Sequence, residues 1–165
     1  EMNRLIGEFL ALSRGLEKET EQEIDLGQLL QELADHARNE GAEVAWQTQS
    51  PCLVSAGPMA LRRILGNLIG NAVRYGAGKP LTLDCECSPE ASVIQILDHG
   101  PGIPPDQLES VFRPFYRLES SRSITTGGSG LGLAIARQLA DANGWKIELL
   151  PREGGGTAAR LTLTR

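Results

Sequence analysis

The chain has 165 residues, of which 41% are hydrophobic and 22% are charged, and it carries a formal net charge of −5. Its length suits one domain with a short appendage, and such a domain buries about 70% of the surface that its unfolded chain exposes. The acidic balance, without a basic face, argues against a general nucleic-acid-binding protein. No apolar run approaches the ~20 residues of a membrane span, and no signal peptide is visible. Because the chain begins with Glu1, we expect a piece of a longer protein.

The chain has three cysteines, Cys52, Cys85 and Cys87. An odd count without a repeat predicts reduced thiols, as in a cytoplasmic protein. Cys85 and Cys87 lie two positions apart on a predicted strand and therefore share a face, but they lack the spacing of a zinc site. We interpret all three as small core or surface residues.

Hydrophobic residues recur at spacings of three and four between Met2 and Leu16, which predicts an amphipathic helix. A lone helix of this length is marginal in water, so it requires a partner. Either it packs on its own domain, or it is one arm of a helical bundle. The charged segment from Glu17 to Glu23 has no periodicity and is typical of a linker.

The rest of the chain alternates between helices and strands. Asp25 can cap a helix that ends at Gly41, and Pro58 opens a second helix that runs to about Tyr75. The other expected elements are short strands within 43–47 and 52–56, strands at 81–87 and 92–98, a Gly- and Pro-rich stretch at 100–130, a helix at 131–143, and strands at 145–150 and 158–164. Strand hairpins in such an order favour an α/β (α+β) two-layer sandwich, with about three helices on one face of a mixed β-sheet.

The stretch LGNLIGNAVRYG places Asn67, Asn71, Arg74 and Tyr75 on one side of the second helix. Amide oxygens can bind Mg²⁺, a guanidinium can pair with phosphate, and an aromatic ring can cover a base or ribose. The alternative is a helix whose asparagines are merely solvated. The side expected to be buried consists of Leu61, Ile64, Leu65, Leu68 and Val73.

Two glycine-containing stretches suit a ligand of the same kind, one that carries phosphates and a base. LDHGPGIP places Asp98 at a strand end, where an acid can accept a hydrogen bond from an exocyclic amine, and its glycines allow close backbone approach. GGSGLGL precedes a helix, whose N-terminal N–H groups suit phosphate oxygens. It is neither a Walker loop nor a Rossmann fingerprint. The alternative for LDHGPGIP is a tight turn, and the alternative for GGSGLGL is a flexible linker.

The motifs NLIGNAVRYG, DHGPGI, FRPFYR and GGSGLGLAIARQLADANGW occur in this order. Together they resemble the catalytic, ATP-binding domain of bacterial sensor histidine kinases. These belong to the GHKL superfamily, whose Bergerat fold is shared with DNA gyrase, MutL-type repair ATPases and heat-shock chaperone ATPases. The resemblance covers roughly Ile24 to Arg165 and implies ATP and Mg²⁺ as ligands.

The resemblance also implies site residues. Asn71 resembles the Mg²⁺ ligand, and Asn67 its companion beside the triphosphate. Arg74 resembles a phosphate contact, Tyr75 an aromatic packed near the nucleotide, and Asp98 the acid that binds the adenine amino group. The further positions implied in ATP binding are Gly100, Gly102, Ile103, Phe112, Phe115, Gly128, Ser129, Gly130, Leu131 and Gly132.

The stretch from Ile103 to Thr126 resembles the ATP lid, a segment expected to order when nucleotide binds. Phe112, Phe115 and Arg117 resemble the motif that anchors this lid, and Arg117 is expected to reach the γ-phosphate. With Asn67, Asn71 and Arg74, Arg117 completes the implied catalytic set.

Asn67 distinguishes between activities within the superfamily. The related hydrolases usually carry Glu at this position to activate water, and an amide is no useful general base near neutral pH. This favours phosphoryl transfer to a protein nucleophile. The alternatives are an ATP-hydrolysing conformational switch and a noncatalytic nucleotide-binding interaction domain.

Two positions differ from the family pattern. Gly57 stands where an Asp often caps the asparagine helix, although Gly is only slightly weaker as a cap. His99 stands beside Asp98 where the family often has Asn. Neither His99 nor His36 lies in a phosphoacceptor motif, so we expect the acceptor histidine to lie upstream of this chain.

The resemblance implies a domain order and partners. Residues 1–18 resemble the end of the second helix of a dimerisation and histidine-phosphotransfer domain, 19–24 a linker, and 25–165 the catalytic domain. Expected partners are that mostly absent domain and a response regulator, within a full-length homodimer. We expect a cytoplasmic domain of a protein anchored in the bacterial inner membrane, with no nucleic-acid partner and no membrane insertion of the fragment itself.

Overall fold

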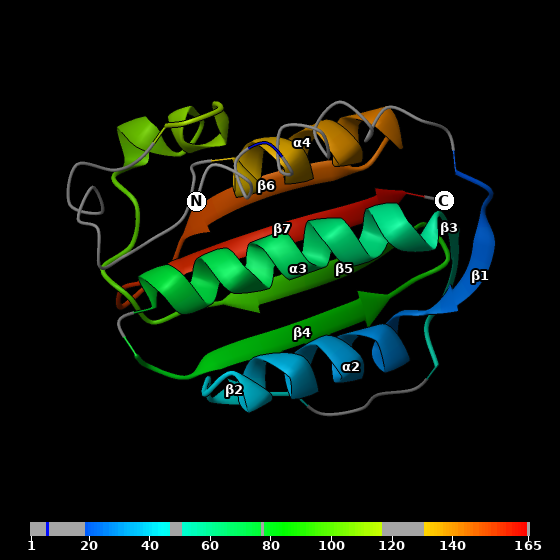
Figure 1. The fold of residues 1–165 in the computed structure, drawn as a ribbon, viewed down its shortest axis with the longest axis horizontal. Helices are drawn as coiled ribbons and strands as arrows, with labels where there is room; N and C mark the ends of the chain where they lie inside the picture. Colours follow the sequence, from blue (N-terminus) through cyan, green and yellow to red (C-terminus); the bar gives the residue numbers. More distant parts are fainter. Residues whose placement is uncertain (1–5, 7–18, 47–50, 77, 117–130, 165) are drawn as a thin grey trace.

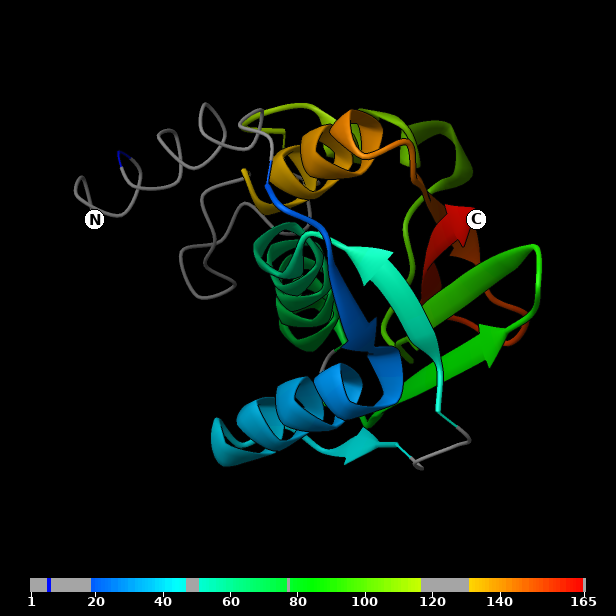
Figure 2. The same cartoon turned by 90° about the vertical axis from the view of Figure 1, so that its right-hand side faces the viewer.

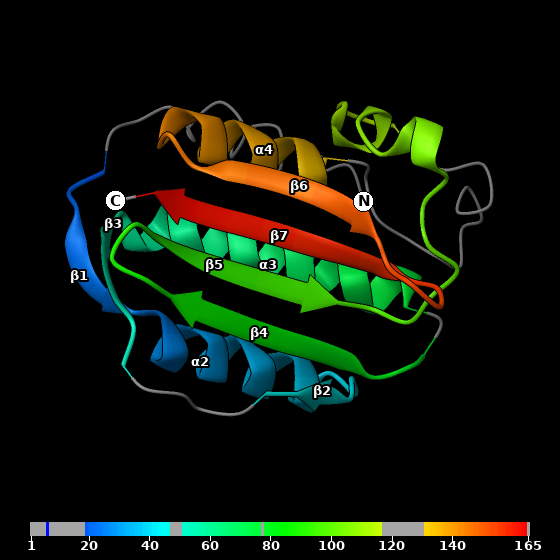
Figure 3. The ribbon, with the colours of Figure 1, turned by 180° about the vertical axis from the view of Figure 1, so that it is seen from behind.

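The computed structural model describes residues 6, 19–46, 51–76, 78–116 and 131–164. The helices α2 (Leu26–Asn39), α3 (Pro58–Tyr75) and α4 (Gly132–Ala142) lie side by side over one face of a β-sheet (Figure 1). The opposite face of the sheet carries none of these helices (Figure 3). The predicted two-layer sandwich is confirmed.

The main sheet has five strands in the order β2-β4-β5-β7-β6. Only β2 and β4 pair in parallel, and the other neighbours are antiparallel, so the sheet is mixed as predicted. Side chains of β4 and β5 alternate between buried and half-exposed, because one face packs on the helices. The strands are β2 (Val44–Ala45), β4 (Leu81–Cys87), β5 (Ala91–Leu97), β6 (Lys146–Pro151) and β7 (Thr157–Thr164).

A second, two-stranded sheet lies beside the first. It pairs β1 (Gln22–Asp25) with β3 (Leu53–Ala56) in antiparallel register, and Figure 2 shows the pair at the end of the main sheet. Residues 22–24, which we expected in a linker, instead form a strand, because β3 offers a free edge to this otherwise unpatterned segment. The domain boundaries themselves stay a prediction. The predicted helix between Met2 and Leu16 lies outside the described residues apart from Ile6.

The ends of α2 and α3 are stabilised in different ways. Asp25 caps α2 as predicted, with Oδ1 accepting a hydrogen bond of 3.0 Å from the N–H of Gly27. The N-cap of α3, Gly57, has no side chain to offer, and Glu19 takes its place. The Glu19 carboxylate accepts hydrogen bonds from the N–H groups of Met59 (2.8 Å) and Ala60 (3.1 Å). The carboxylate also occupies the space that a side chain at Gly57 would need.

The core lies between the helices and the sheet. The predicted buried side of α3 is confirmed at Leu61, Ile64, Leu65 and Leu68 but is wrong at Val73, which is 42% exposed. Val73 lies five residues after Leu68 and is therefore turned roughly 140° away from it around the helix. Within the described ranges, no helix is both long and apolar enough to span a membrane.

The prediction of reduced thiols is wrong for Cys52 and Cys87 and is confirmed for Cys85. Cys52, next to β3, is joined by a disulfide to Cys87 at the end of β4, and Cys85 is a buried free thiol. The two partners are 35 positions apart. Their proximity arises from the packing of the two sheets, which local spacing does not reveal.

Candidate nucleotide-binding site

The polar side of α3 holds the first group of predicted site residues. The side chains of Asn67, Asn71, Arg74 and Tyr75 are all half-buried, so they lie between the core and the surface. The guanidinium of Arg74 lies 6.0 Å from the ring centroid of Tyr75, at the outer limit of a cation–π contact. The helix thus presents amide, guanidinium and aromatic groups along one face, as its sequence predicts.

Asn67 connects this face to the start of α4. Its Nδ2 donates a hydrogen bond of 3.1 Å to the carbonyl oxygen of Gly132, the first residue of α4. This contact engages the amino end of the amide, so Oδ1 is the end that can bind a cation. No side chain caps the N-terminus of α4 in the described part of the chain, and its N–H groups suit an anion.

Asp98 follows β5 and is only 7% exposed. Its Oδ1 accepts hydrogen bonds from the N–H groups of Gly100 (3.0 Å) and Thr157 (3.1 Å). These two donors fix the orientation of the carboxylate. Its second oxygen is then the one available to accept from an amino group of a ligand.

Glycines allow the Asp98 turn to touch its neighbours. A Cβ on Gly100 would overlap the carbonyl oxygen of Tyr75, so the turn lies directly against the C-terminal end of α3. Gly156 has a φ of +93° and approaches the Asp98 carbonyl equally closely. Only glycine adopts this conformation without strain. Asp98 is therefore held between α3 and the β6–β7 hairpin.

The sequence did not reveal the contribution of that hairpin. Besides Thr157, Arg152 contacts the turn: its Nη1 donates a hydrogen bond of 2.6 Å to the Asp98 carbonyl oxygen and lies 3.4 Å from Nδ1 of His99. The only signal was the run of three glycines in PREGGGT, which all have positive φ. Such a run indicates close backbone approach without naming the segment approached.

The predicted lid-anchoring motif is divided between two environments. Phe112, in η2 (Ser110–Phe112), is buried, and the Arg137 guanidinium of α4 lies 3.8 Å from its ring centroid. Arg137 also pairs with Glu109 at 3.1 Å, and this hydrogen-bonded cation lowers the pKa of the Glu109 carboxyl. Phe115 is 59% exposed at a φ of +65°, which is unusual for a bulky residue. It does not share the Phe112 environment.

The remaining predicted positions differ in their surroundings. Leu131 is fully buried and belongs to the core, and Ile103 is half-buried against it. Gly102 has a φ of +82° and packs against the backbone of Gly156. Arg117, Gly128, Ser129 and Gly130 lie outside the described residues.

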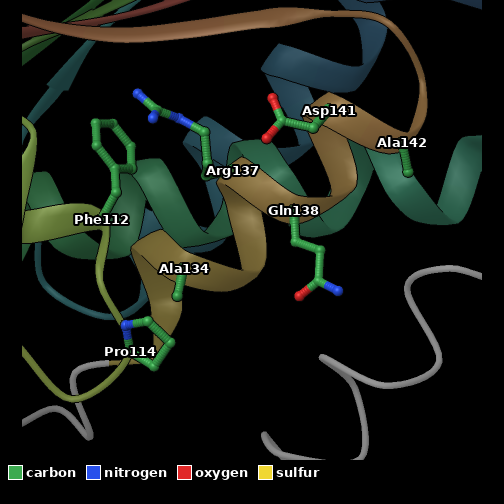
Figure 4. A pocket seen from close by; sticks show the side chains of 7 residues that line it. All are labelled: Phe112, Pro114, Ala134, Arg137, Gln138, Asp141 and Ala142. Atoms are coloured by element: carbon green, nitrogen blue, oxygen red, sulfur yellow. The ribbon is translucent and has the colours of Figure 1, made fainter.

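A pocket of about 460 Å³ lies beside α4 but is distinct from the predicted site (Figure 4). Phe112 and Pro114 form one wall, and the α4 residues that line the pocket are Ala134, Arg137, Gln138, Asp141 and Ala142. Among the predicted site residues that the structure describes, Phe112 alone lines it. The asparagine face and the Asp98 turn therefore define the candidate site on geometry and donor chemistry, not on this pocket.

Together these contacts define a class of protein. The C-terminal end of α3 touches the turn that holds the buried Asp98, at Gly100, and Asn67 in its middle touches the first residue of α4, a helix whose N-terminus no side chain caps among the described residues. An acid that can accept from an amino group, and N–H groups that can donate to phosphate, suit the two ends of one nucleotide. The fold and these groups are compatible with a nucleotide-binding α/β domain.

Comparison with known proteins gives the family. Residues 56–165 match the family described as histidine kinase-, DNA gyrase B-, and HSP90-like ATPase, and the chain belongs to it. The sensor histidine kinase GtrS of Pseudomonas aeruginosa is 39% identical over 148 residues, which cover 89% of this chain and 30% of GtrS. The sensor protein CutS of Streptomyces coelicolor is 36% identical over 139 residues, covering 83% and 33%. The chain spans about a third of the length of these curated relatives.

A solved structure is similar over almost the whole chain. The crystal structure of full-length ShkA in complex with AMPPNP matches with a TM-score of 0.79 at 25% identity, covering 96% of this chain and 35% of that one. The predicted family and Bergerat-type fold are confirmed. The chain is an ATP-binding domain of the sensor histidine kinase type, the catalytic domain of that enzyme class.

Proposed function

We propose that this domain binds Mg·ATP between α3, the Asp98 turn and α4, and transfers the γ-phosphate to a histidine outside the chain. The observation that carries the proposal is the placement of the Asn67 amide, which touches α4 while its helix touches the Asp98 turn. This arrangement gives one ligand an acid at one end and phosphate-binding groups at the other.

Asp98 is proposed to select adenine. Two backbone donors orient one carboxylate oxygen, so the other can accept from the exocyclic amine of adenine. Guanine has a carbonyl at the corresponding position and offers no donor there. Burial of Asp98 strengthens this discrimination, because an unpaired buried acceptor is costly.

Asn71 and Asn67 are proposed to face the metal and the triphosphate. The residues present fit Mg²⁺, because amide oxygens are hard donors and the Asn67 contact with Gly132 engages Nδ2 and not Oδ1. When bound, Mg²⁺ supplies neutralisation of phosphate charge. Arg74 is proposed to add a fixed positive charge beside the phosphates, as is Arg117 on the predicted lid.

Transfer is favoured over hydrolysis by the identity of residue 67. An amide cannot remove a proton from water near neutral pH, and Asn67 already donates to Gly132. The domain then contributes positioning and electrostatic stabilisation, while the acceptor histidine supplies the nucleophile. Hydrolysis-driven conformational work is the second function to be tested.

The larger context is also proposed. Residues 1–18 would end the second helix of a dimerisation and histidine-phosphotransfer domain, with the domain boundary near residue 25. The full-length protein would be a membrane-anchored homodimer with this domain in the cytoplasm, and it would pass its phosphate to a response-regulator aspartate. The similarity to GtrS and CutS supports this proposal.

The test combines two assays. The chain is incubated with Mg·ATP labelled at the γ-phosphate, alone and with the upstream acceptor segment of its own full-length protein as a separate polypeptide. We expect slow phosphate release by the chain alone and an acid-labile, base-stable label on the acceptor. Rapid release without transfer would instead establish the hydrolase function. Absence of nucleotide binding by a folded chain would leave an interaction module.

A further inference from the structure

A cluster of sulfur atoms lies where the two sheets meet. The Sγ atoms of Cys52, Cys85 and Cys87 all lie within 4.8 Å of one another. Cys52 and Cys85 are buried, and Cys87 is exposed. The cluster is therefore compact, with one side open to solvent.

The strands fix this geometry. Cys85 and Cys87 are two positions apart on β4, so both side chains point to the same face of the sheet. Cys87 pairs with Ser92 on β5, whose Oγ lies 3.5 Å from Cys87 Sγ and 3.7 Å from Cys52 Sγ. The Cys52 backbone is held by a hydrogen bond of 2.8 Å from the N–H of Leu26 to its carbonyl oxygen. Rigid elements thus bring three sulfurs and one hydroxyl together.

The surrounding charge favours a cation. Burial, and then the carboxylates of Asp84, Asp25 and Glu86, raise the pKa of the Cys85 thiol from 9.0 to about 11. The same carboxylates that oppose an isolated thiolate attract a positive ion, and a bound cation reverses the local pKa effect. Without a metal, Cys85 stays protonated and is a poor nucleophile for thiol exchange.

We propose that Cys52, Cys85 and Cys87, once the disulfide is reduced, bind one thiophilic divalent ion of the Zn²⁺ class. Tetrahedral Zn²⁺ with bonds of about 2.3 Å separates its sulfur ligands by about 3.8 Å, and the three Sγ atoms of this cluster all lie within 4.8 Å of one another, so small side-chain rotations after reduction suffice. Three thiolates leave a fourth position, which the exposed side at Cys87 opens to water or to the Ser92 hydroxyl. Soft thiolate donors exclude Mg²⁺, so this site does not compete for the metal of the nucleotide site.

The disulfide and the metal are alternative occupants of the cluster. Reduction by a phosphine transfers two electrons to the disulfide, while water supplies two protons to the thiols and the oxygen of the phosphine oxide. Binding of Zn²⁺ then releases the protons of the coordinating thiols. Ser92 lies near the start of β5 and Asp98 directly after its end, six residues or about 20 Å further at the rise of a strand, so the cluster is remote from the proposed nucleotide site.

The test measures Zn²⁺ binding with a chromophoric competitor, on the whole chain with a phosphine reductant and after air oxidation. We expect one Zn²⁺ per reduced chain and none on the oxidised chain. Cys85→Ser leaves the disulfide pair intact yet should weaken Zn²⁺ binding to the reduced chain by more than the ~10–100-fold typical of lost supporting contacts. Cys52→Ser removes one partner of the disulfide and should weaken Zn²⁺ binding to the reduced chain by a similar factor.

Two further measurements test the metal site and the folding of each variant independently. Thiolate-to-metal charge-transfer absorption with Co²⁺ should appear in the reduced wild type and be lost in both variants. Binding of a nonhydrolysable ATP analogue by each sample shows that it is folded, and this binding should not change. Absence of stoichiometric Zn²⁺ binding by the reduced, folded wild type would overturn the proposal, as would a Cys85→Ser variant that binds as tightly as wild type.

Discussion

Replacing Asp98 by Asn and by Ala should separate its two roles. In Asp98→Ala, the buried N–H groups of Gly100 and Thr157 both lose their acceptor. An unsatisfied buried donor costs about 1–3 kcal/mol, so the free energy of unfolding should fall by about 2–6 kcal/mol. Asp98→Asn keeps a neutral acceptor for them, and we expect a loss of about 1–2 kcal/mol, because charge-assisted hydrogen bonds are roughly twice as strong as neutral ones.

The two variants should differ in stability but not in nucleotide binding, which both should lose. An asparagine that keeps its oxygen on the backbone donors turns its amino group toward adenine and offers no acceptor there. Both variants should therefore lose ATP binding by more than about 100-fold, although Asp98→Asn stays folded. Urea denaturation measures the stability, and calorimetric titration with AMPPNP measures the binding. An Asp98→Asn variant that binds AMPPNP like wild type would refute the assigned role of this carboxylate.

Three further substitutions test the supports of the site. Glu19→Ala should lower the free energy of unfolding by about 1 kcal/mol in urea titration through loss of the α3 cap, whereas the exposed Glu23→Ala should change it by less than about 0.5 kcal/mol. Arg137→Ala should lower the free energy of unfolding by about 1–3 kcal/mol, because it removes the guanidinium packed on the Phe112 ring and bonded to the Ile147 carbonyl oxygen. Arg137→Lys should restore only part of this loss. An Arg137→Ala variant as stable as wild type would contradict the reasoning. Gly100→Ala should reduce both stability and AMPPNP affinity, because its Cβ would overlap the Tyr75 carbonyl oxygen. Gly70→Ala, in open space on α3, should raise stability by about 0.5–1 kcal/mol. A Gly100→Ala variant more stable than Gly70→Ala would be incompatible with the packing described.

Features set by local sequence were predictable. Pro58 and Gly76 delimit α3, and the spacing of its leucines identifies the buried side. Asp98 was recognisable because an acid follows a strand and precedes glycines. In each case a short stretch contains both the element and the signal that ends it.

Features set by contacts between distant segments were not predictable. Glu19 reaches the N-terminus of α3 across about 40 residues, and Arg152 reaches Asp98 across 54. The disulfide joins Cys52 to Cys87 across the meeting point of two sheets. None of these residues stands in a local pattern that names its partner, because the partner is set by strand pairing and helix packing.

The metal–triphosphate site on α3 is the central claim, and one titration tests it most directly. AMPPNP is titrated into wild-type chain and Asn71→Ala, with Mg²⁺ and with a chelator, while urea denaturation confirms that both are folded. We predict that Mg²⁺ strengthens binding to the wild type and that Asn71→Ala loses this gain. Equal Mg²⁺ dependence in both proteins, or no binding to the folded wild type, would contradict the claim.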